Sequence, residues 1–369
     1  MSNSLGHLFR ITTFGESHGG AVGVVIDGCP SGHRISLEEV QVWLNRRRPG
    51  QSHLSSPRNE ADAVECLSGM VDGITLGTPL TLVIRNKDQK KEHYSDLSKA
   101  YRPSHADYTT DAKWGLRAPT GGGRASARET IGRVAAAAVA EQILTALVPD
   151  LRVVAWVESV KDIVAKVADP GTVRRADVEE TPLRCPDRGQ RDAMEKVILD
   201  AKKKGDTVGG TIVCTIAGGP AGLGEPVFDK LDAMLARAML SLPACRGFEL
   251  GSGFSSTALY GSEHNDAFYS QDGQIRTRTN RSGGVQGGIS NGEPIWFRVP
   301  FKPVATIFRE QESVDRTGNS LDLKPKAGRH DPCVLPRAVP MVEAMALLTF
   351  MDYYLRQLAW KAARGPFEL

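Results

Sequence analysis

A glycine-rich turn followed by fixed cations lies near the middle of the chain. Residues 121–130 read GGGRASARET, and an apolar run continues to Ala140. Glycines let the backbone turn tightly and approach a ligand, and the spacing of Ser126 and Glu129 matches a capping box that would start a helix. Free amides at a helix start favour phosphate or carboxylate, as do the neighbouring arginines Arg124, Arg128 and Arg133. The same pattern is typical of an ordinary turn before a core helix, so these residues alone leave both interpretations open.

Three other loops place a histidine or an aspartate beside arginine and glycine. His18 lies in the glycine turn FGESHGG, His105 follows a proline in RPSHAD, and GRHDP at residues 328–332 sets Arg, His and Asp side by side. Histidine is the natural proton carrier near neutral pH. A single loop histidine more often has a structural or surface role, but three such loops together favour proton-transfer chemistry if they meet in space.

Composition excludes several classes of protein. The 369 residues contain 41% hydrophobic residues, enough for a substantial core. The segment 1–10 has no long apolar region behind a basic start, and the longest apolar stretch, 134–148, is interrupted by Glu141 and Gln142, so we expect neither a signal peptide nor a membrane span. The six cysteines lie far apart with no C-x-x-C pair, which predicts no metal site, no disulfide framework and a cytoplasmic location. A net charge of +3 does not require nucleic acid, yet 46 lysines and arginines can line a site for an anionic ligand.

Common nucleotide and metal signatures are missing from the sequence. It contains no G-x-x-x-x-G-K-[ST], no G-x-G-x-x-G between a strand and a helix, and no H-E-x-x-H. A P-loop enzyme, an ordinary Rossmann dehydrogenase and a zincin are therefore disfavoured.

Hydrophobic periodicity predicts a mixture of strands and helices without a regular βαβ repeat, which favours an α+β fold with antiparallel sheets flanking helices. The predicted strands are 22–27, 80–85, 211–216 and 295–300. The predicted helices are 36–48, 126–147, 187–204, 229–240 and 339–358. Two long polar stretches, near 86–110 and 309–331, interrupt this pattern, and we interpret them as active-site loops that act as lids.

Several of these segments resemble the signature segments of the chorismate synthase family, in the same order. The three signatures correspond to 15–30, 122–139 and 329–344, and further matches occur at 46–50, 102–108, 222–229, 287–290 and 302–303. The resemblance runs nearly end to end. It implies a single domain, 1–369, with the β-α-β sandwich of that family, in which helices lie between antiparallel sheets, and it implies a homotetramer.

The resemblance also implies an activity. Members of this family catalyse the anti-1,4-elimination of phosphate from 5-enolpyruvylshikimate 3-phosphate to give chorismate, the last step of the shikimate pathway for aromatic amino acid biosynthesis. The reaction, that of a carbon-oxygen lyase, requires reduced FMN although it is redox-neutral overall. NADPH is implied only indirectly, for flavin reduction.

The positions that match the family's motifs imply roles for individual residues of this chain. His18 would donate a proton to the reduced flavin, His105 would donate one to the departing phosphate, and Asp331 would act with flavin N5 in removing the substrate proton. The substrate carries two carboxylates and a phosphate, which suit the forked donors of arginine. The implied substrate-binding residues are Ser17, Arg47, Arg133 and Arg329. The implied FMN-binding residues are Arg47, Arg124, Ala125, Ser126, Ala244, Gly287, Lys302, Pro303, Val304, Ala305, Thr306 and Arg329.

Two departures from the family pattern stand out. His53 replaces an arginine that many relatives place after the Arg-Pro-Gly segment, which puts a nicotinamide contact there in doubt, and Pro243 stands where an amide side chain usually precedes Ala244. At least one arginine of 46–48 is expected to stabilise only the C-terminal end of its helix.

The rival functions are a flavin reductase that uses the same FMN site, and a basic protein that binds the RNA backbone. The second lacks interleaved aromatic residues, which make up only 6% of the chain.

Overall fold

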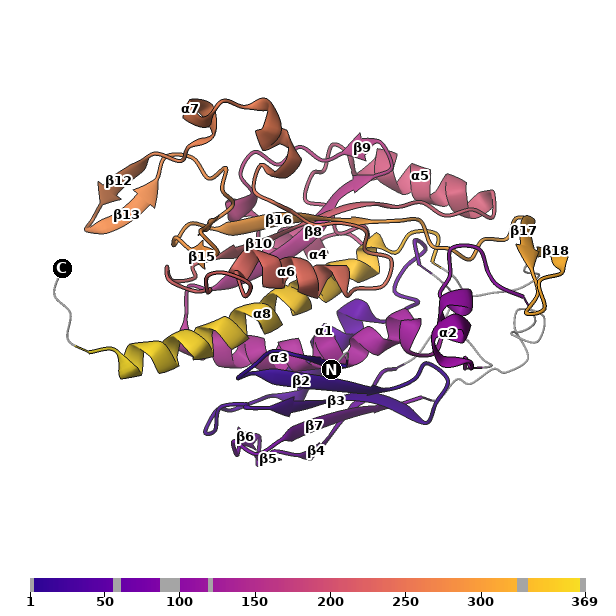
Figure 1. Cartoon of the computed structure of the whole chain (residues 1–369), viewed down its shortest axis with the longest axis horizontal. Coiled ribbons are helices and arrows are strands. Elements are labelled where there is room, and N and C mark those ends of the chain that lie inside the picture. Colours follow the sequence, from indigo (N-terminus) through magenta and orange to yellow (C-terminus); the bar gives the residue numbers. More distant parts are fainter. Residues whose placement is uncertain (1–2, 56–60, 87–99, 119–121, 324–330, 366–369) are drawn as a thin grey trace.

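Two antiparallel five-stranded sheets enclose a layer of helices in the computed structural model of the chain (Figure 1). The structure describes residues 3–55, 61–86, 100–118, 122–323 and 331–365. The first sheet has the order β1 (Ser4–Leu5), β2 (Arg10–Gly15), β3 (Ala21–Asp27), β7 (Leu80–Arg85) and β4 (Val64–Ser68). The second has the order β11 (Glu249–Leu250), β16 (Ile295–Phe301), β10 (Gly210–Ala217), β8 (Arg152–Val160) and β9 (Ile163–Val164). The predicted α+β fold with helices between antiparallel sheets is confirmed.

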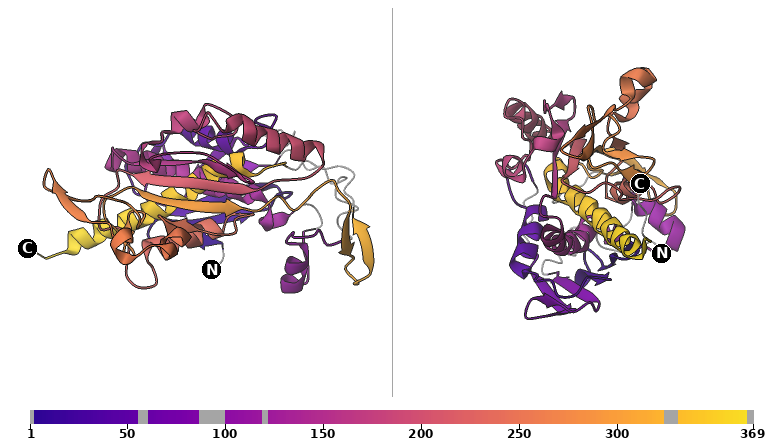
Figure 2. Two further views of the ribbon diagram at one scale, coloured as in Figure 1. Left: turned by 90° about the horizontal axis from the view of Figure 1, so that it is seen from above. Right: turned by 90° about the vertical axis from the view of Figure 1, so that its left-hand side faces the viewer.

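The helices between the sheets are α1 (Leu37–Arg47), α3 (Thr130–Leu147), α6 (Leu231–Leu240) and α8 (Leu335–Ala363). The other helices are α2 (Asp107–Trp114), α4 (Arg175–Glu179), α5 (Arg191–Lys203) and α7 (Gly261–His264). Four two-stranded sheets complete the fold: β5 (Met70–Val71) with β6 (Ile74–Thr75), β12 (Phe268–Gln271) with β13 (Gln274–Thr277), β14 (Val285–Gln286) with β15 (Ile289–Ser290), and β17 (Gln311–Val314) with β18 (Ser320–Leu323). Figure 2 shows α2 and the β17–β18 hairpin projecting together from one end of the molecule.

The burial of each strand in the second sheet depends on which faces of that sheet are covered by helices. β8 is buried without a break from Val153 to Val157, because α8 packs on one side of the second sheet while α4 and α5 pack against β8 as well. β16, farther from those outer helices, alternates between buried and half-buried residues. β10 pairs along its whole length with both neighbours, for example Cys214 with Phe297 and with Ala155, and so forms the centre of this sheet.

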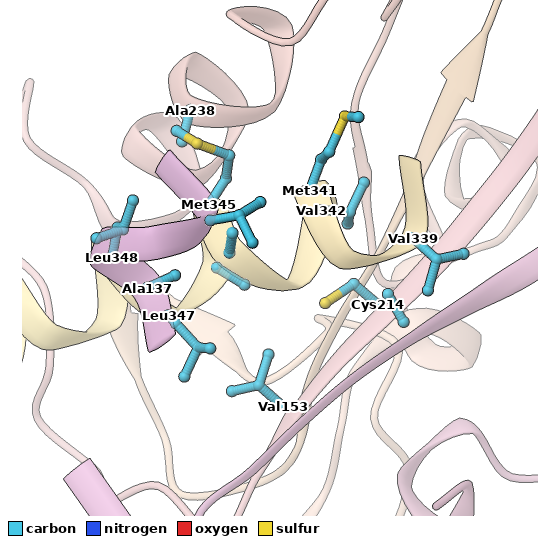
Figure 3. Close-up of a cluster of buried hydrophobic side chains, with 14 of the residues drawn as sticks. Ala137, Val153, Cys214, Ala238, Val339, Met341, Val342, Met345, Leu347 and Leu348 are labelled. Atoms are coloured by element: carbon cyan, nitrogen blue, oxygen red, sulfur yellow. The ribbon is translucent and has the colours of Figure 1, made fainter. Parts of the chain in front are cut away.

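The apolar core lies where α3 and α8 meet between the sheets (Figure 3). Small residues let the helices approach closely: α3 contains four consecutive buried alanines, and a Cβ on its Gly132 would lie 2.7 Å from the carbonyl oxygen of Gly23 in β3. α8 contributes the large side chains, among them Met341 and Met345. Both helical stretches are long and apolar enough to cross a membrane, but 67% and 89% of their most apolar windows are buried inside the protein, as expected for core helices.

Helix α8 begins four residues earlier than predicted and carries Pro340 in its interior. Proline lacks the N–H that would bond to the carbonyl of the residue four positions back, here Pro336. Arg184 supplies the missing donor, because its Nη1 donates to the carbonyl oxygen of Pro336. The sequence predicted a helix start at residue 339, whereas the helix continues through both Pro336 and Pro340 and is stabilised there by this long-range hydrogen bond.

The two polar stretches expected to be loops contain regular structure. The first runs into α2, and the second contains the β17–β18 hairpin. Their described parts contact each other: Tyr101 N donates to Val314 O, and Arg316 forms a bidentate ion pair with Asp111. Residues 87–99 and 324–330 of these stretches lie outside the described residues.

Arg184→Met should lower the midpoint of thermal unfolding, because a buried carbonyl acceptor left without a donor costs about 1–3 kcal/mol. Adding Pro340→Ala to that variant supplies an N–H inside the helix and should recover part of the loss. The ion pair of Arg184 with Glu179 is absent from both variants, so it does not affect their comparison. Circular dichroism melts of the parent, both single variants and the double variant provide the measurement. A double variant no more stable than Arg184→Met would contradict this account of α8.

Candidate active site

A cavity of about 720 Å³ collects residues from segments that are far apart in the sequence. Its size lies within the range of about 300–1,000 Å³ that is usual for ligand pockets. Its walls come from the loop between β2 and β3, the end of α1, the segment leading into α2, the start of α3, the segment after α6, the segment after β16 and the start of α8. The predicted site residues that line it are His18, Arg47, His105, Arg124, Ala125, Ser126, Arg133, Ala244, Lys302, Val304, Ala305, Thr306 and Asp331.

Other predicted site residues lie elsewhere. Ser17 is buried behind His18 and hydrogen-bonds to its Nδ1 at 3.0 Å. Pro303 is not part of the wall, although both of its neighbours are. Gly287 lies in the β14–β15 turn, next to Gly288, whose carbonyl oxygen accepts from Leu231 N at the start of α6. The cavity, in contrast, contains the residues that follow the end of α6. The two ends of this ten-residue helix are about 15 Å apart, so Gly287 is distant from the cavity. Arg329 lies outside the described residues.

The cavity is strongly cationic. Eight of its lining side chains carry a fixed positive charge: Arg47, Arg102, Arg124, Arg128, Arg133, Arg246, Lys302 and Arg337. Two lining residues are carboxylates, Glu129 and Asp331. This imbalance suits a ligand with several negative charges. Among the described residues, no group of three or more His, Cys, Asp or Glu side chains could hold a metal ion.

The glycine-rich segment forms two short 3-10 turns, η2 (Gly123–Ala125) and η3 (Ala127–Glu129), before α3 begins. The predicted capping box is wrong. Ser126 Oγ accepts from the backbone N–H of Arg128, and the Glu129 carboxylate accepts from Thr13 Oγ1 at 2.6 Å and from Arg133 Nε at 2.9 Å. Glu129 therefore orders a cavity arginine instead of capping the helix.

Arg124 joins the glycine-rich segment to the first sheet. It donates to the carbonyl oxygens of Gly15 and Thr13, both at 3.1 Å, near the end of β2. These bonds place the start of α3 beside the loop that carries His18. The interpretation of this segment as part of a charged site is therefore supported by its position on the cavity wall.

Arg47 and Arg128 share one buried carboxylate, Asp62. Asp62 Oδ1 lies 3.0 Å from Arg128 Nη1, and its Oδ2 lies 3.4 Å from Arg47 Nη2. The Asp62 side chain is completely buried and Arg47 is only 1% exposed, so both guanidinium groups are held firmly on the cavity wall. Sequence reasoning missed Asp62, because no motif or periodicity connects it to either arginine.

Arg46 points away from the cavity into the helix layer. Its Nη1 lies 2.7 Å from Glu343 on α8, and it lies over the ring of Trp43, whose other cationic neighbour is Arg175. Complete burial acts to raise the pKa of Glu343, but the charges of Arg46 and Arg175 hold that pKa below its ordinary value. Within the arginine triplet, Arg47 thus lines the cavity, while Arg46 belongs to a buried ion-pair network.

The loop that carries His18 is held by Asn86, the residue directly after β7. Asn86 Nδ2 donates to the carbonyl oxygens of Glu16 and Gly19, at 2.9 and 2.6 Å, and its Oδ1 accepts from Arg128 Nε. One amide side chain therefore positions both a histidine loop and a cavity arginine. The sequence predicted only that Asn86 begins a polar active-site loop, and its positioning role has no signal beyond a polar residue at the end of a buried strand.

The second histidine lies in an ion-pair cluster at the start of α2. Its Nδ1 is 2.9 Å from Asp107 Oδ1, and Arg102 forms a bidentate pair with the same carboxylate. Burial acts to raise the pKa of Asp107, but hydrogen bonds from Arg102 and His105 hold that pKa well below its ordinary value. Arg102 and Asp107 both lie in the segment RPSHAD, but the sequence suggested a role only for His105.

Asp331 lies just before α8 and forms an ion pair with Arg337, in the first turn of that helix. Arg337 also donates from Nε to the carbonyl oxygen of Arg47 at 3.2 Å, which connects α8 to the end of α1. Arg337 and Arg246 line the cavity although the sequence analysis named neither.

The two departures from the family pattern lie in different surroundings. His53 is outside the cavity wall, with its side chain 57% exposed and its Nε2 3.4 Å from Glu195. Pro243 lines the cavity, and Ala244 after it has a positive φ of 66°.

Comparison with known proteins points to one family. The family model for chorismate synthase matches residues 9–355. A chorismate synthase from Synechococcus elongatus is 59% identical over 360 residues, covering 97% of this chain and 99% of the relative. One from Methylacidiphilum infernorum is 56% identical over 368 residues and covers both chains fully. A crystal structure of chorismate synthase is similar with a TM-score of 0.72 and 27% identity, covering 96% of this chain and 94% of that one.

Asn86→Asp should loosen the loop at residues 16–20 without disturbing the fold. The carboxylate can still accept from Arg128 but cannot donate to the carbonyl oxygens of Glu16 and Gly19. Two lost hydrogen bonds, each contributing about 1 kcal/mol, correspond to amide exchange in this loop that is faster by about tenfold or more. Hydrogen exchange followed by mass spectrometry provides the measurement, with the surface variant Asn45→Asp as the control. Unchanged exchange at 16–20 would show that Asn86 does not hold the loop.

Proposed function

The chain belongs to the chorismate synthase family, and on this basis we propose that it eliminates phosphate from 5-enolpyruvylshikimate 3-phosphate in the anti-1,4 sense to give chorismate, with reduced FMN as cofactor. This is the reaction of a carbon-oxygen lyase and the last step of the shikimate pathway. The observation that carries the proposal is a single cavity with eight fixed cations, two histidines and an aspartate. A substrate with two carboxylates and a phosphate matches this charge, and the three titratable groups match the proton transfers that the elimination needs.

The cavity contains a feature that fits the phosphate of FMN. Arg246 and Lys302 line the same wall, and among the described residues neither forms an ion pair with a carboxylate. Partial burial lowers the pKa of Lys302, and the nearby positive charge of Arg246 lowers it further. A phosphate beside them would relieve this repulsion, with the hydroxyls of Thr306 and Ser126 as further donors. Reduced FMN, when bound, supplies an electron to the substrate that is returned later, so that the overall reaction is redox-neutral.

The residues of the chain account for the remaining steps. Arg47 and Arg128, fixed by Asp62, would bind the anionic groups of the substrate. In the 1,4-elimination, the C–O bond breaks and phosphate leaves with the bonding electrons. A proton leaves the carbon on the far side of the intervening ring double bond, and that double bond shifts so that a conjugated diene forms. His105 would protonate the departing phosphate, and the Asp331 carboxylate would take up the substrate proton. His18, whose Nδ1 is bonded to Ser17, would hold a proton at its other ring nitrogen for the cofactor.

Assembly and location follow the family in this proposal. We expect a homotetramer in the cytoplasm. Support for an oligomer comes from large aromatic side chains that are mostly exposed in the single chain, namely Phe228, Phe254, Tyr260 and Trp360. Exposed apolar surface of this kind is typical of contacts between proteins.

We expect a monofunctional enzyme that does not reduce its own flavin. Under anaerobic conditions, dithionite-reduced FMN should support chorismate formation, followed by absorbance, with the flavin left reduced at the end. NADPH with oxidised FMN should support little or none, because the exposed His53 lies outside the cavity and stands where many relatives have arginine. A rate with NADPH that matches the dithionite rate would place the protein in a bifunctional class. No chorismate with either reductant would contradict the proposed function.

His18→Ala and His105→Ala should each lower turnover by about 10²-fold or more, because a general acid acts chiefly on the transition state. Binding of FMN, measured by flavin fluorescence, should change little. His53→Ala serves as the control, since His53 is exposed and lies outside the cavity wall. Near-normal turnover of either cavity variant at saturating reduced FMN would remove that histidine from the mechanism.

A further inference from the structure

We propose that Asp107 is the positioning residue of His105: its carboxylate accepts the Nδ1–H of the imidazole, so that Nε2 faces the cavity and the protonated ring is stabilised. The inference rests on the proposed function, in which His105 protonates the departing phosphate. Asp107 itself is not part of the cavity wall, so it acts through His105 and does not contact the substrate.

The geometry favours one arrangement of the imidazole protons. His105 Nδ1 lies 2.9 Å from Asp107 Oδ1, and 3.0 Å from Arg102 Nη2. Arg102 Nη2 is closer to Asp107 Oδ1, at 2.7 Å, and so donates to the carboxylate. Nδ1 therefore carries a hydrogen and donates to the same oxygen. The remaining ring nitrogen belongs to a side chain that is 22% exposed and lines the cavity.

The surroundings of the Asp107 carboxylate allow it to act only as a hydrogen-bond acceptor. It is 5% exposed, and Arg102 donates to its Oδ2 from both Nε, at 2.7 Å, and the backbone N, at 3.1 Å. Arg117 Nη1 lies 3.4 Å from Oδ2 on another side. Such a group stays ionised and cannot donate a proton, so it binds the protonated form of His105 more strongly than the neutral form.

A purely structural role for Asp107 is the competing explanation, because a carboxylate at the first position of a helix also stabilises the helix dipole and its neighbouring arginines. The chain offers a matched control on the same helix. The side chain of Asp111 is 9% exposed and pairs with Arg117 and Arg316, but among the described residues no hydrogen bond or ion pair joins it to His105. The charged groups around the His105 cluster are Arg102, Arg117, Asp111 and Lys302, whose Nζ donates to Ser104 O at 3.0 Å.

The first test does not depend on activity. Diethyl pyrocarbonate acylates an imidazole only when the attacking nitrogen is unprotonated, so the pH at which His105 becomes reactive reports its charge. In the full-length protein, peptide mass spectrometry should show this midpoint lower by about one pH unit in Asp107→Asn, because the protonated ring loses its anionic neighbour. Asp111→Asn should leave the midpoint unchanged, and the exposed His53 serves as an internal reference in every sample. Should Asp107→Asn not fold, Asp107→Ser provides the same neutral replacement.

The second test separates positioning from binding. Asp107→Asn should lower kcat by about 10²-fold while KM for the enolpyruvyl substrate changes little, because a misplaced proton donor affects the transition state more than the ground state. The alkaline limb of its pH–rate profile should move to lower pH by the same amount as the modification midpoint. Asp111→Asn should stay within a few-fold of the parent.

The outcomes distinguish the two proposals. An equal midpoint in Asp107→Asn and the parent, or an equal shift in both aspartate variants, would overturn the positioning role even if chorismate forms normally. A parent protein that forms no chorismate, combined with a midpoint shift confined to Asp107→Asn, would contradict the proposed function and leave the Asp107–His105 pair established.

Discussion

Mutual repulsion among the cations around one cavity is the constraint on which the rest of the structure depends. Two unit charges a few ångströms apart interact by about 4 kcal/mol at the effective dielectric constant of a protein surface, and eight cations line this wall. The fold offsets the repulsion with four carboxylates placed beside or behind them. Asp62 contacts Arg47 and Arg128, and the remaining three are Asp107, Glu129 and Asp331. Each carboxylate is also nearly fully buried, so it fixes the direction of its arginine as well as balancing the charge.

These carboxylates come from different parts of the sandwich, and this explains why the site needs the whole fold. Asp62 precedes β4 in the first sheet, Glu129 directly precedes α3 in the helix layer, and Asp331 precedes α8 beside the second sheet. They converge because α3 lies against the first sheet, where Gly132 allows close contact with β3, and because the same helix packs on α8. The buried pair of Arg46 and Glu343 connects α1 to α8 in the same layer. Packing of the helix layer therefore sets the shape of the cavity.

The sequence was informative where the physical signal is local or where a motif contains the reactive side chains. Short apolar runs predicted strands of both sheets, and the loops with His18, His105 and Asp331 do meet at one cavity. It was uninformative where the partner lies far along the chain. Asn86 contacts Glu16 and Arg128, 70 and 42 residues away, and Asp62 contacts Arg128, 66 residues away; no window of periodicity contains such pairs. The start of α8 predicted at residue 339 is wrong for the same reason, because the compensating donor, Arg184, is 152 residues from the carbonyl that it serves.

The distribution of carboxylates divides the cationic wall into two kinds of subsite. Arg47, Arg128 and Arg133 each have a carboxylate partner within 3.4 Å, Asp62 or Glu129. A ligand anion at these arginines therefore gains directed hydrogen bonds but competes with those carboxylates for the guanidinium donors. Arg246 and Lys302 have no carboxylate partner among the described residues and repel each other. An anion gains the most electrostatic free energy at that second pair, since it removes a repulsion as well as forming an attraction. The dianionic phosphate group of the proposed cofactor is best placed there, while the singly charged carboxylates of the proposed substrate suit the arginines that the fold has already oriented.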